Sequence, residues 1–220
     1  MTAVGILGGT FDPVHRGHLL LAASVRRALA LERVALLPCA VPPHKPGRPT
    51  AARFHRLEML YLAVEGRAGL GVSTYEIARG GVHFTIDTLR ALRAGAAGVS
   101  PVFIVGSDAL GEITSWKDHQ ALLEEFDFAA VVRPAVSGTA GPEGWPEVVT
   151  RRVSPAVRRE AHPPPGAGGR VFVVEVEALP ISSSDVRDRC AGGMPLVDLV
   201  PAPVARYIQR HRLYREEAPR

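Results

Sequence analysis

Residues 3–18 read AVGILGGTFDPVHRGH, a short apolar run followed by two glycines, a loop with a proline, and two histidines. The apolar run at 3–7 is typical of a buried strand. Helical spacing follows over 17–31, and a second apolar run covers 34–37. This stretch predicts a β-α-β unit, whose strands are parallel and whose ligands bind beyond the carboxyl ends of the strands. The apolar positions that define the helix are Leu20, Leu21, Val25, Ala28 and Leu29.

The rest of the chain repeats this alternation. Apolar runs at 102–105, 128–132 and 171–174 indicate strands, and helical periodicity returns at 53–64, 85–92, 182–190 and 204–211. Between 135 and 169 proline and glycine are frequent, which predicts loops with one short helix. We therefore expect an α/β fold, a doubly wound parallel sheet with helices on both faces. It forms a single domain over residues 1–215, and residues 216–220 form a frayed tail.

Composition excludes several classes of protein. The chain has 220 residues, of which 46% are hydrophobic and 22% charged, and these values are ordinary for a globular protein. Two cysteines, Cys39 and Cys190, without CxxC spacing, predict neither a zinc site nor a secreted disulfide framework. No basic leader precedes the first apolar run, and no run approaches about 18 apolar residues. We expect a cytoplasmic protein with no membrane partner.

A mild positive charge accompanies this composition. The formal net charge is +4, and the basic residues are scattered along the sequence. A scattered distribution favours small phosphorylated anions over a polynucleotide, so no nucleic-acid partner is expected. Among the 26 basic residues only Lys45 and Lys117 are lysines, which draws attention to Lys45.

Two segments carry residues suited to binding phosphates. In the first, Gly8 and Gly9 allow backbone N–H groups to approach an anion, and His15 and His18 start the helix that follows. Each histidine alone is better explained as a capping or packing residue, whereas the whole segment favours function. In the second, at 180–187, serines precede Arg187 near a helix start. Alone this segment is an ordinary N-cap with a surface arginine, but the two together suit a polyphosphate.

These segments resemble the motifs of the nucleotidylyltransferase superfamily, T/H-x-G-H at the first loop and I-S-S/T-x-x-x-R at 181–187. Residues 37–45 (LPCAVPPHK), Phe84-Thr85, Gly106-Ser107-Asp108, Trp116 and the C-terminal segment with Tyr207 and Tyr214 are similar to bacterial nicotinate-nucleotide adenylyltransferases. The resemblance implies a Rossmann-like fold. It also implies adenylyl transfer from ATP to nicotinate mononucleotide, giving deamido-NAD and pyrophosphate by direct in-line attack, with Mg²⁺ accompanying ATP.

The resemblance also implies a role for each matching residue. His18 and His15 would be catalytic, and no side chain would hold a resident metal. The expected ATP-binding residues are Gly8, Gly9, Thr10, Phe11, Gly106, Asp108, Ile181, Ser182, Ser183 and Arg187. The expected residues for nicotinate mononucleotide are His44, Lys45, Thr85, Trp116 and Arg133.

Three positions depart from the family pattern. Cys39 stands where the family usually carries asparagine, Phe84 replaces a tyrosine, and Ser184 replaces a threonine. The alternatives are a pantetheine-phosphate adenylyltransferase, which is typically shorter, and a nucleotide-binding regulator without catalysis. A nucleic-acid binder is supported only by the basic charge. The sequence leaves a homo-oligomer open.

Overall fold

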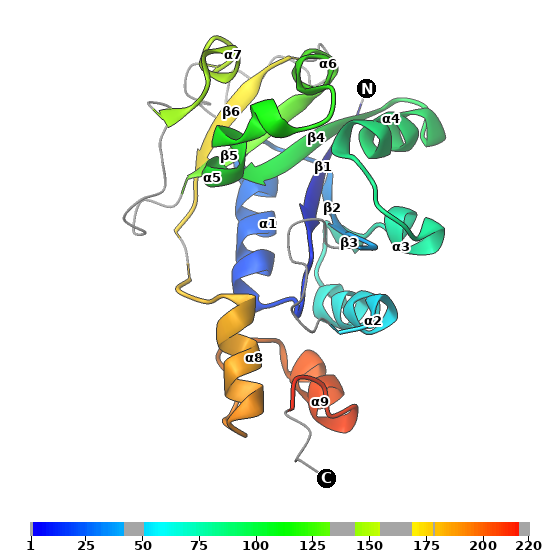
Figure 1. Ribbon diagram of the computed structural model, residues 1–220, viewed down its shortest axis with the longest axis vertical. Coiled ribbons are helices and arrows are strands. Elements are labelled where there is room, and N and C mark those ends of the chain that lie inside the picture. Colours follow the sequence, from blue (N-terminus) through cyan, green and yellow to red (C-terminus); the bar gives the residue numbers. More distant parts are fainter. Residues whose placement is uncertain (1, 42–50, 133–143, 155–168, 178, 216–220) are drawn as a thin grey trace.

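The computed structural model describes residues 2–41, 51–132, 144–154, 169–177 and 179–215. Its centre is a sheet of six strands in the order β3-β2-β1-β4-β5-β6, and all neighbouring strands are parallel. This order and the helices on both faces confirm the doubly wound α/β fold (Figure 1). The strands are β1 (Thr2–Gly9), β2 (Arg33–Pro38), β3 (Leu70–Val72), β4 (Val99–Gly106), β5 (Asp127–Val132) and β6 (Val171–Glu175).

Each face of the sheet has its own hydrophobic core, because successive side chains of a strand point to opposite faces. On β1, Ala3 and Leu7 pack with helices α1 (Arg16–Ala28), α2 (Arg53–Val64), α8 (Ser183–Ala191) and α9 (Ala202–Arg210). Val4 and Ile6 belong to the opposite core. That core is formed with α4 (Thr85–Gly95), α5 (Ser107–Gly111), the 3-10 helix η1 (Ile113–Ser115), α6 (His119–Glu125) and α7 (Glu147–Thr150).

The buried face of α1 differs from the one expected. Val25 and Leu29 are buried as expected and Leu21 packs against the same core, whereas Leu20 is 36% exposed and Ala28 is exposed. Leu19 and Ala22, which were not expected, are buried in their place. The helix begins at Arg16, one residue earlier than expected, and ends at Ala28. The periodicity of 17–31 therefore predicted the helix correctly but placed some residues on the wrong face. Consecutive leucines fit more than one possible apolar face of a helix, so the pattern did not settle which face is buried.

Several short elements were not predicted. They are β3, α5, η1, α6 and α3 (Tyr75–Arg79), none of which exceeds seven residues. Elements this short contain too few apolar repeats to reveal a period. Within 135–169, the expected short helix is α7, and most of that segment lies outside the described residues, as do 42–50 and the tail at 216–220. No helix in the described part of the chain is long and apolar enough to cross a membrane.

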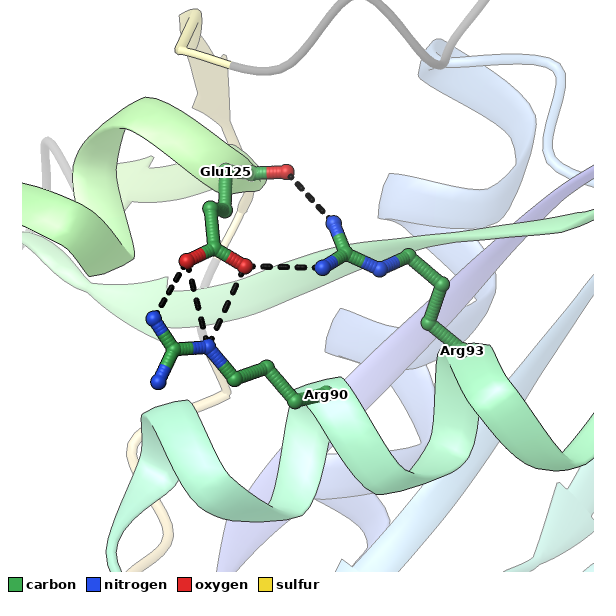
Figure 2. A network of polar contacts seen from close by, with 3 residues as sticks. All are labelled: Arg90, Arg93 and Glu125. Carbon is green, nitrogen blue, oxygen red and sulfur yellow. Dashed lines mark hydrogen bonds and ion pairs between the residues drawn. The ribbon is translucent and has the colours of Figure 1, made fainter.

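A network of charged side chains joins α4 to α6 (Figure 2). The carboxylate of Glu125 accepts hydrogen bonds from Arg90 and Arg93, with Arg93 Nη2 at 2.7 Å from Glu125 Oε2. Hydrogen bonds from Arg90 are the main reason that the pKa of Glu125 is lowered to about 2. This network holds the body of α4, whose first residues reach the pocket described below.

Candidate active site

The carboxyl ends of β1 and β4 lie side by side where the strand order reverses. β1 ends at Gly8 and Gly9, β4 ends at Gly106, and the two strands pair in register with Leu7 opposite Ile104. The connections that leave these two strands run to opposite faces of the sheet, so a crevice opens between them. Ligands of doubly wound sheets bind at such a switch point. A Cβ on Gly8 would meet the ring of Phe103 at 3.3 Å, which explains the need for a small residue.

A pocket of about 500 Å³ opens at this switch point. It is lined from β1 and its loop by Gly8, Gly9 and Thr10, and from β4 by Gly106. The wall opposite comes from the start of α4 and from the segment after η1. The structure thus gathers six of the expected site residues around one cavity, namely Gly8, Gly9, Thr10, Thr85, Gly106 and Trp116.

Aromatic side chains shape one side of this pocket. Trp116 follows η1 and stands edge-on against Phe103, with ring centroids 6.1 Å apart. Thr85 is the first residue of α4, and Phe84 before it is 49% exposed. An aromatic wall of this kind suits a flat ring. The phenylalanine that replaces the family's tyrosine therefore keeps an aromatic ring at the pocket and loses only a hydroxyl.

The two histidines of the opening loop lie ring against ring, and neither is among the described residues that line the pocket. His15 caps α1, and its ring stacks on that of His18 with centroids 3.7 Å apart. The backbone N–H of His15 donates to His18 Nδ1 at 3.2 Å, so in neutral His18 the proton is on Nε2. His18 also contacts the edge of the Phe11 ring, with centroids 5.0 Å apart. A Cβ on Gly17 would lie 3.0 Å from His15 Nδ1, so the glycine of the motif makes room for this ring.

His15 is buried, with 6% of its surface exposed. Burial lowers its pKa to about 4, and the carboxylate of Asp185 offsets part of that effect. At neutral pH the imidazole is therefore uncharged and has one N–H to donate. Its Nδ1 is buried without a hydrogen-bond partner among the described residues.

The low pKa of His15 predicts a pH-dependent stability. Between pH 6.5 and about 4 the unfolded chain binds a proton at His15 that the folded chain does not bind. The free energy of unfolding should therefore fall as the pH is lowered through this range. Replacing His15 with glutamine, which does not titrate, should flatten this slope in urea unfolding measured at several pH values. An unchanged slope would show that His15 titrates normally.

The start of α8 docks on the opening loop, so the two sequence motifs meet. Arg187 Nη1 donates to Asp12 O at 2.7 Å, and Ser183 Oγ donates to Pro13 O at 3.0 Å. The backbone oxygen of Ile181 lies near Gly17, 3.7 Å from where a Cβ would be. Figure 1 shows α8 below the first turn of α1, at the end of the sheet where β1 finishes. The guanidinium of Arg187 and the histidine-bearing loop are therefore parts of one surface.

The first turn of α8 is closed by a capping box. Ser182 Oγ accepts from Asp185 N at 3.1 Å, and Ser182 N donates to Asp185 Oδ2 at 2.7 Å. Hydrogen bonds from Ser182 are the main reason that the pKa of Asp185 is lowered. Ser182 is thus both an expected ligand contact and a capping residue, and the cap fixes where the helix starts.

The buried side chain of Asp12 anchors the same loop. It is 3% exposed, and its Oδ1 accepts from Ala51 N at 3.0 Å and from the hydroxyl of Tyr214 at 2.7 Å. Burial together with the neighbouring Asp12 carboxylate raises the pKa of Tyr214 above its ordinary value. The C-terminal segment therefore holds the loop that carries the histidines.

Arg56 is a buried arginine that links two loops and was not predicted from the sequence. It is 1% exposed, and its guanidinium donates to Thr10 O at 2.7 Å and to Cys39 O at 2.8 Å. It thereby joins the loop after β1 to the residues after β2, with a further hydrogen bond to Ala40 O at 3.1 Å. Its position in line with the buried residues Met59, Leu60 and Ala63 of α2 was an available signal, because a charge on an apolar helix face is rare.

Other expected residues lie elsewhere. Asp108 is an exposed residue in the first turn of α5, and its carboxylate lies over Gly106, where a Cβ would clash with it. His44, Lys45 and Arg133 lie outside the described residues. Several residues that line the pocket had no role predicted from the sequence, among them Glu76, His83, Thr88 and Lys117.

Comparison with known proteins identifies the class to which this site belongs. Residues 6–189 match a family model described as cytidylyltransferase-like, and the chain belongs to that family. Within it, a relative from Symbiobacterium thermophilum is 40% identical over 97% of this chain and 96% of its own length. A relative from a Thermoanaerobacter species is 38% identical over 97% of this chain and 95% of its own. Both are named "Probable nicotinate-nucleotide adenylyltransferase", and the chain is a member of the nicotinate-nucleotide adenylyltransferase family.

Solved structures agree on the fold. The Plasmodium falciparum nicotinic acid mononucleotide adenylyltransferase complexed with NaAD superposes with a TM-score of 0.71, covering 97% of this chain and 98% of that one. The sequences are 16% identical, so this likeness concerns the arrangement of the chain alone. The same enzyme complexed with APC gives the same values.

Proposed function

We propose that the chain transfers the adenylyl group of ATP to nicotinate mononucleotide, giving deamido-NAD and pyrophosphate. The observation that carries the proposal is the docking of Arg187 and Ser183 on the loop that holds His15 and His18. This contact brings a guanidinium, a hydroxyl and the two stacked imidazoles together on the loop that follows Gly8, Gly9 and Thr10, which line the pocket with the aromatic wall. The names of relatives about 40% identical over nearly the whole chain support the same reaction.

The reaction needs the two substrates held in line. A phosphate oxygen of the mononucleotide attacks the α-phosphorus of ATP, a new P–O bond forms, and the bond to the bridging oxygen breaks as pyrophosphate leaves. No covalent bond to the protein is required. Catalysis then rests on positioning and on stabilising negative charge that develops on the phosphate oxygens. His18, with its proton on Nε2, is suited to donate to such an oxygen, and neutral His15 can donate one further hydrogen bond.

The remaining ATP contacts are assigned by their position. Backbone N–H groups near Gly8, Gly9 and Thr10 lie at the carboxyl end of β1, where they can approach the triphosphate. Arg187 would bind the β- and γ-phosphates through its planar fork. Asp108, at the end of β4, would bind the ribose hydroxyls of adenosine.

Mg²⁺ is proposed to enter with ATP. In the described part of the chain no three His, Cys, Asp or Glu side chains are grouped so as to hold a metal ion. Mg²⁺ is commonly bound by substrate phosphates and waters with one or two carboxylates, which is the reason for proposing that the nucleotide carries it. Bound there, the ion would neutralise charge on the phosphates. A cytoplasmic location and a homo-oligomer stay predictions from the sequence.

The acceptor is proposed to occupy the pocket between Trp116 and Thr85. Its pyridine ring would lie against the indole, and its phosphate would point toward the histidine loop. His44, Lys45 and Arg133 are proposed to help bind that phosphate. A phosphopantetheine acceptor has no aromatic ring for this wall, which favours the pyridine nucleotide.

Replacing Trp116 with alanine should raise the KM for nicotinate mononucleotide about 10-fold or more, because ring stacking against one substrate is lost. The KM for ATP should change much less. Both constants come from steady-state pyrophosphate release with one substrate varied at a time. Equal changes in the two KM values would indicate that Trp116 serves only to pack against Phe103.

The proposed activity itself is tested with purified protein, ATP and Mg²⁺. Pyrophosphate release is measured with nicotinate mononucleotide, nicotinamide mononucleotide or phosphopantetheine as the acceptor. We expect release with a pyridine mononucleotide and formation of the corresponding dinucleotide. Release with phosphopantetheine alone would support the related adenylyltransferase instead, and binding of ATP without any release would indicate a regulator.

A further inference from the structure

Lys117 brings a positive charge to the aromatic side of the pocket. Among the lining residues that the structure describes, it is the one with a permanent positive charge. It follows Trp116 directly, and its Nζ lies 5.0 Å from the centroid of the Phe84 ring. The ammonium group is therefore next to the aromatic side chains that would enclose the acceptor's ring.

Asp87 holds the ammonium group in this position. Lys117 Nζ lies 2.8 Å from Asp87 Oδ2, and the two side chains are 41% and 48% exposed. Asp87 is in the first turn of α4, which begins at Thr85, so the ion pair joins α4 to the segment after η1. An exposed pair of this kind is weak, so the ammonium can turn to a better anion.

The other ionisable groups of the pocket do not compete for this role. Glu76 is buried, and its Oε1 accepts a hydrogen bond from Thr88 Oγ1 at 2.9 Å. His83 makes a 2.8 Å hydrogen bond through Nε2 to Gly80 O. Cys39 is the remaining ionisable residue of the described lining, and burial raises the pKa of its thiol, so it supplies no positive charge. An anionic ring substituent would therefore find its cationic partner on the Lys117 side.

We propose that Lys117 is a specificity-determining residue, which favours an acceptor whose pyridine ring carries a carboxylate over one that carries an amide. This inference rests on the proposed function. The two acceptors are close in shape and differ by one negative charge. A cation at the edge of the ring can therefore discriminate between them by charge, whereas packing, which reads only shape, cannot. The ammonium gains a carboxylate partner from the first acceptor and only a neutral oxygen from the second.

The test compares kcat/KM for nicotinate and nicotinamide mononucleotide. Replacing Lys117 with methionine should lower the ratio of the two constants about 3- to 10-fold, mainly through the KM for the nicotinate form, with the KM for ATP unchanged. Lys117→Arg, which keeps the charge, should restore most of the ratio. The matched control is Arg151→Met, which removes one charge from an exposed pair with Glu147 that does not line the pocket.

A second variant separates this role from packing. Asp87→Asn keeps the shape of the partner but removes its charge, so the ratio should rise about 2- to 5-fold as Lys117 is released. An unchanged ratio in Lys117→Met, or an equal fall in Arg151→Met, would overturn the proposal while leaving the proposed function standing. No pyrophosphate release by the unaltered protein with either acceptor would overturn both.

Discussion

Replacing His18 with alanine is expected to lower kcat by about 10²–10³-fold or more, because a hydrogen-bond donor to the developing phosphate charge is lost. The geometry gives the reason. The backbone N–H of His15 donates to His18 Nδ1 at 3.2 Å, which leaves the proton of the neutral ring on Nε2. The measurement is steady-state pyrophosphate release at saturating ATP and nicotinate mononucleotide.

The control for this variant is His119→Ala, which removes a histidine at the start of α6, away from the opening loop. It should keep near-normal turnover. The melting temperature of His18→Ala should stay close to that of the unaltered protein, since His18 is only partly buried. Near-normal turnover in His18→Ala would contradict its role in the transition state.

Replacing Arg187 with alanine is expected to lower kcat/KM for ATP by about 100-fold, as lost charge-assisted hydrogen bonds to phosphate are each worth about 1.5–3 kcal/mol. Arg187 also loses its bond to Asp12 O at 2.7 Å, so the loop it touches would be held less firmly. Lysine at this position should recover only part of the loss, because it lacks the planar fork.

The matched control lies on the same helix. Arg189 donates to Pro195 O at 3.4 Å, and no described contact joins it to the histidine loop. Arg189→Ala should leave the KM for ATP within about 2-fold of normal, as is usual for an exposed charge. If both variants changed kcat/KM for ATP equally, Arg187 would be contributing only to the general charge of α8.

The sequence was most informative where local pattern and chemistry coincide. The apolar run, the two glycines and the histidine spacing of residues 3–18 predicted β1, the loop and α1 together. The serines before Arg187 predicted the start of α8 to within one residue, because a capping box is a local signal. The meeting of these two segments is a contact over 170 residues or more of sequence. Their shared suitability for a polyphosphate and the resemblance to a family suggested that they act together, but no local pattern predicted the contact itself.

Residues that act through tertiary contacts were harder to recognise. Arg56 looks like any helix arginine until its neighbours on the same face are seen to be buried. Lys117 shared with Lys45 the signal of being a rare lysine, yet its place at the pocket depends on η1, which is only three residues long. Glu76 comes from α3, a five-residue helix without a readable period. The acceptor side of the site was therefore less predictable than the phosphate side.

Catalysis as proposed requires the histidine loop and the start of α8 to bind one triphosphate. The direct measurement is a crystal structure of the protein with a non-hydrolysable ATP analogue. We expect the His18 imidazole and the Arg187 guanidinium within hydrogen-bonding distance of phosphate oxygens of the same analogue molecule. A triphosphate that contacts only one of these two groups, or that binds away from both, would contradict the claim.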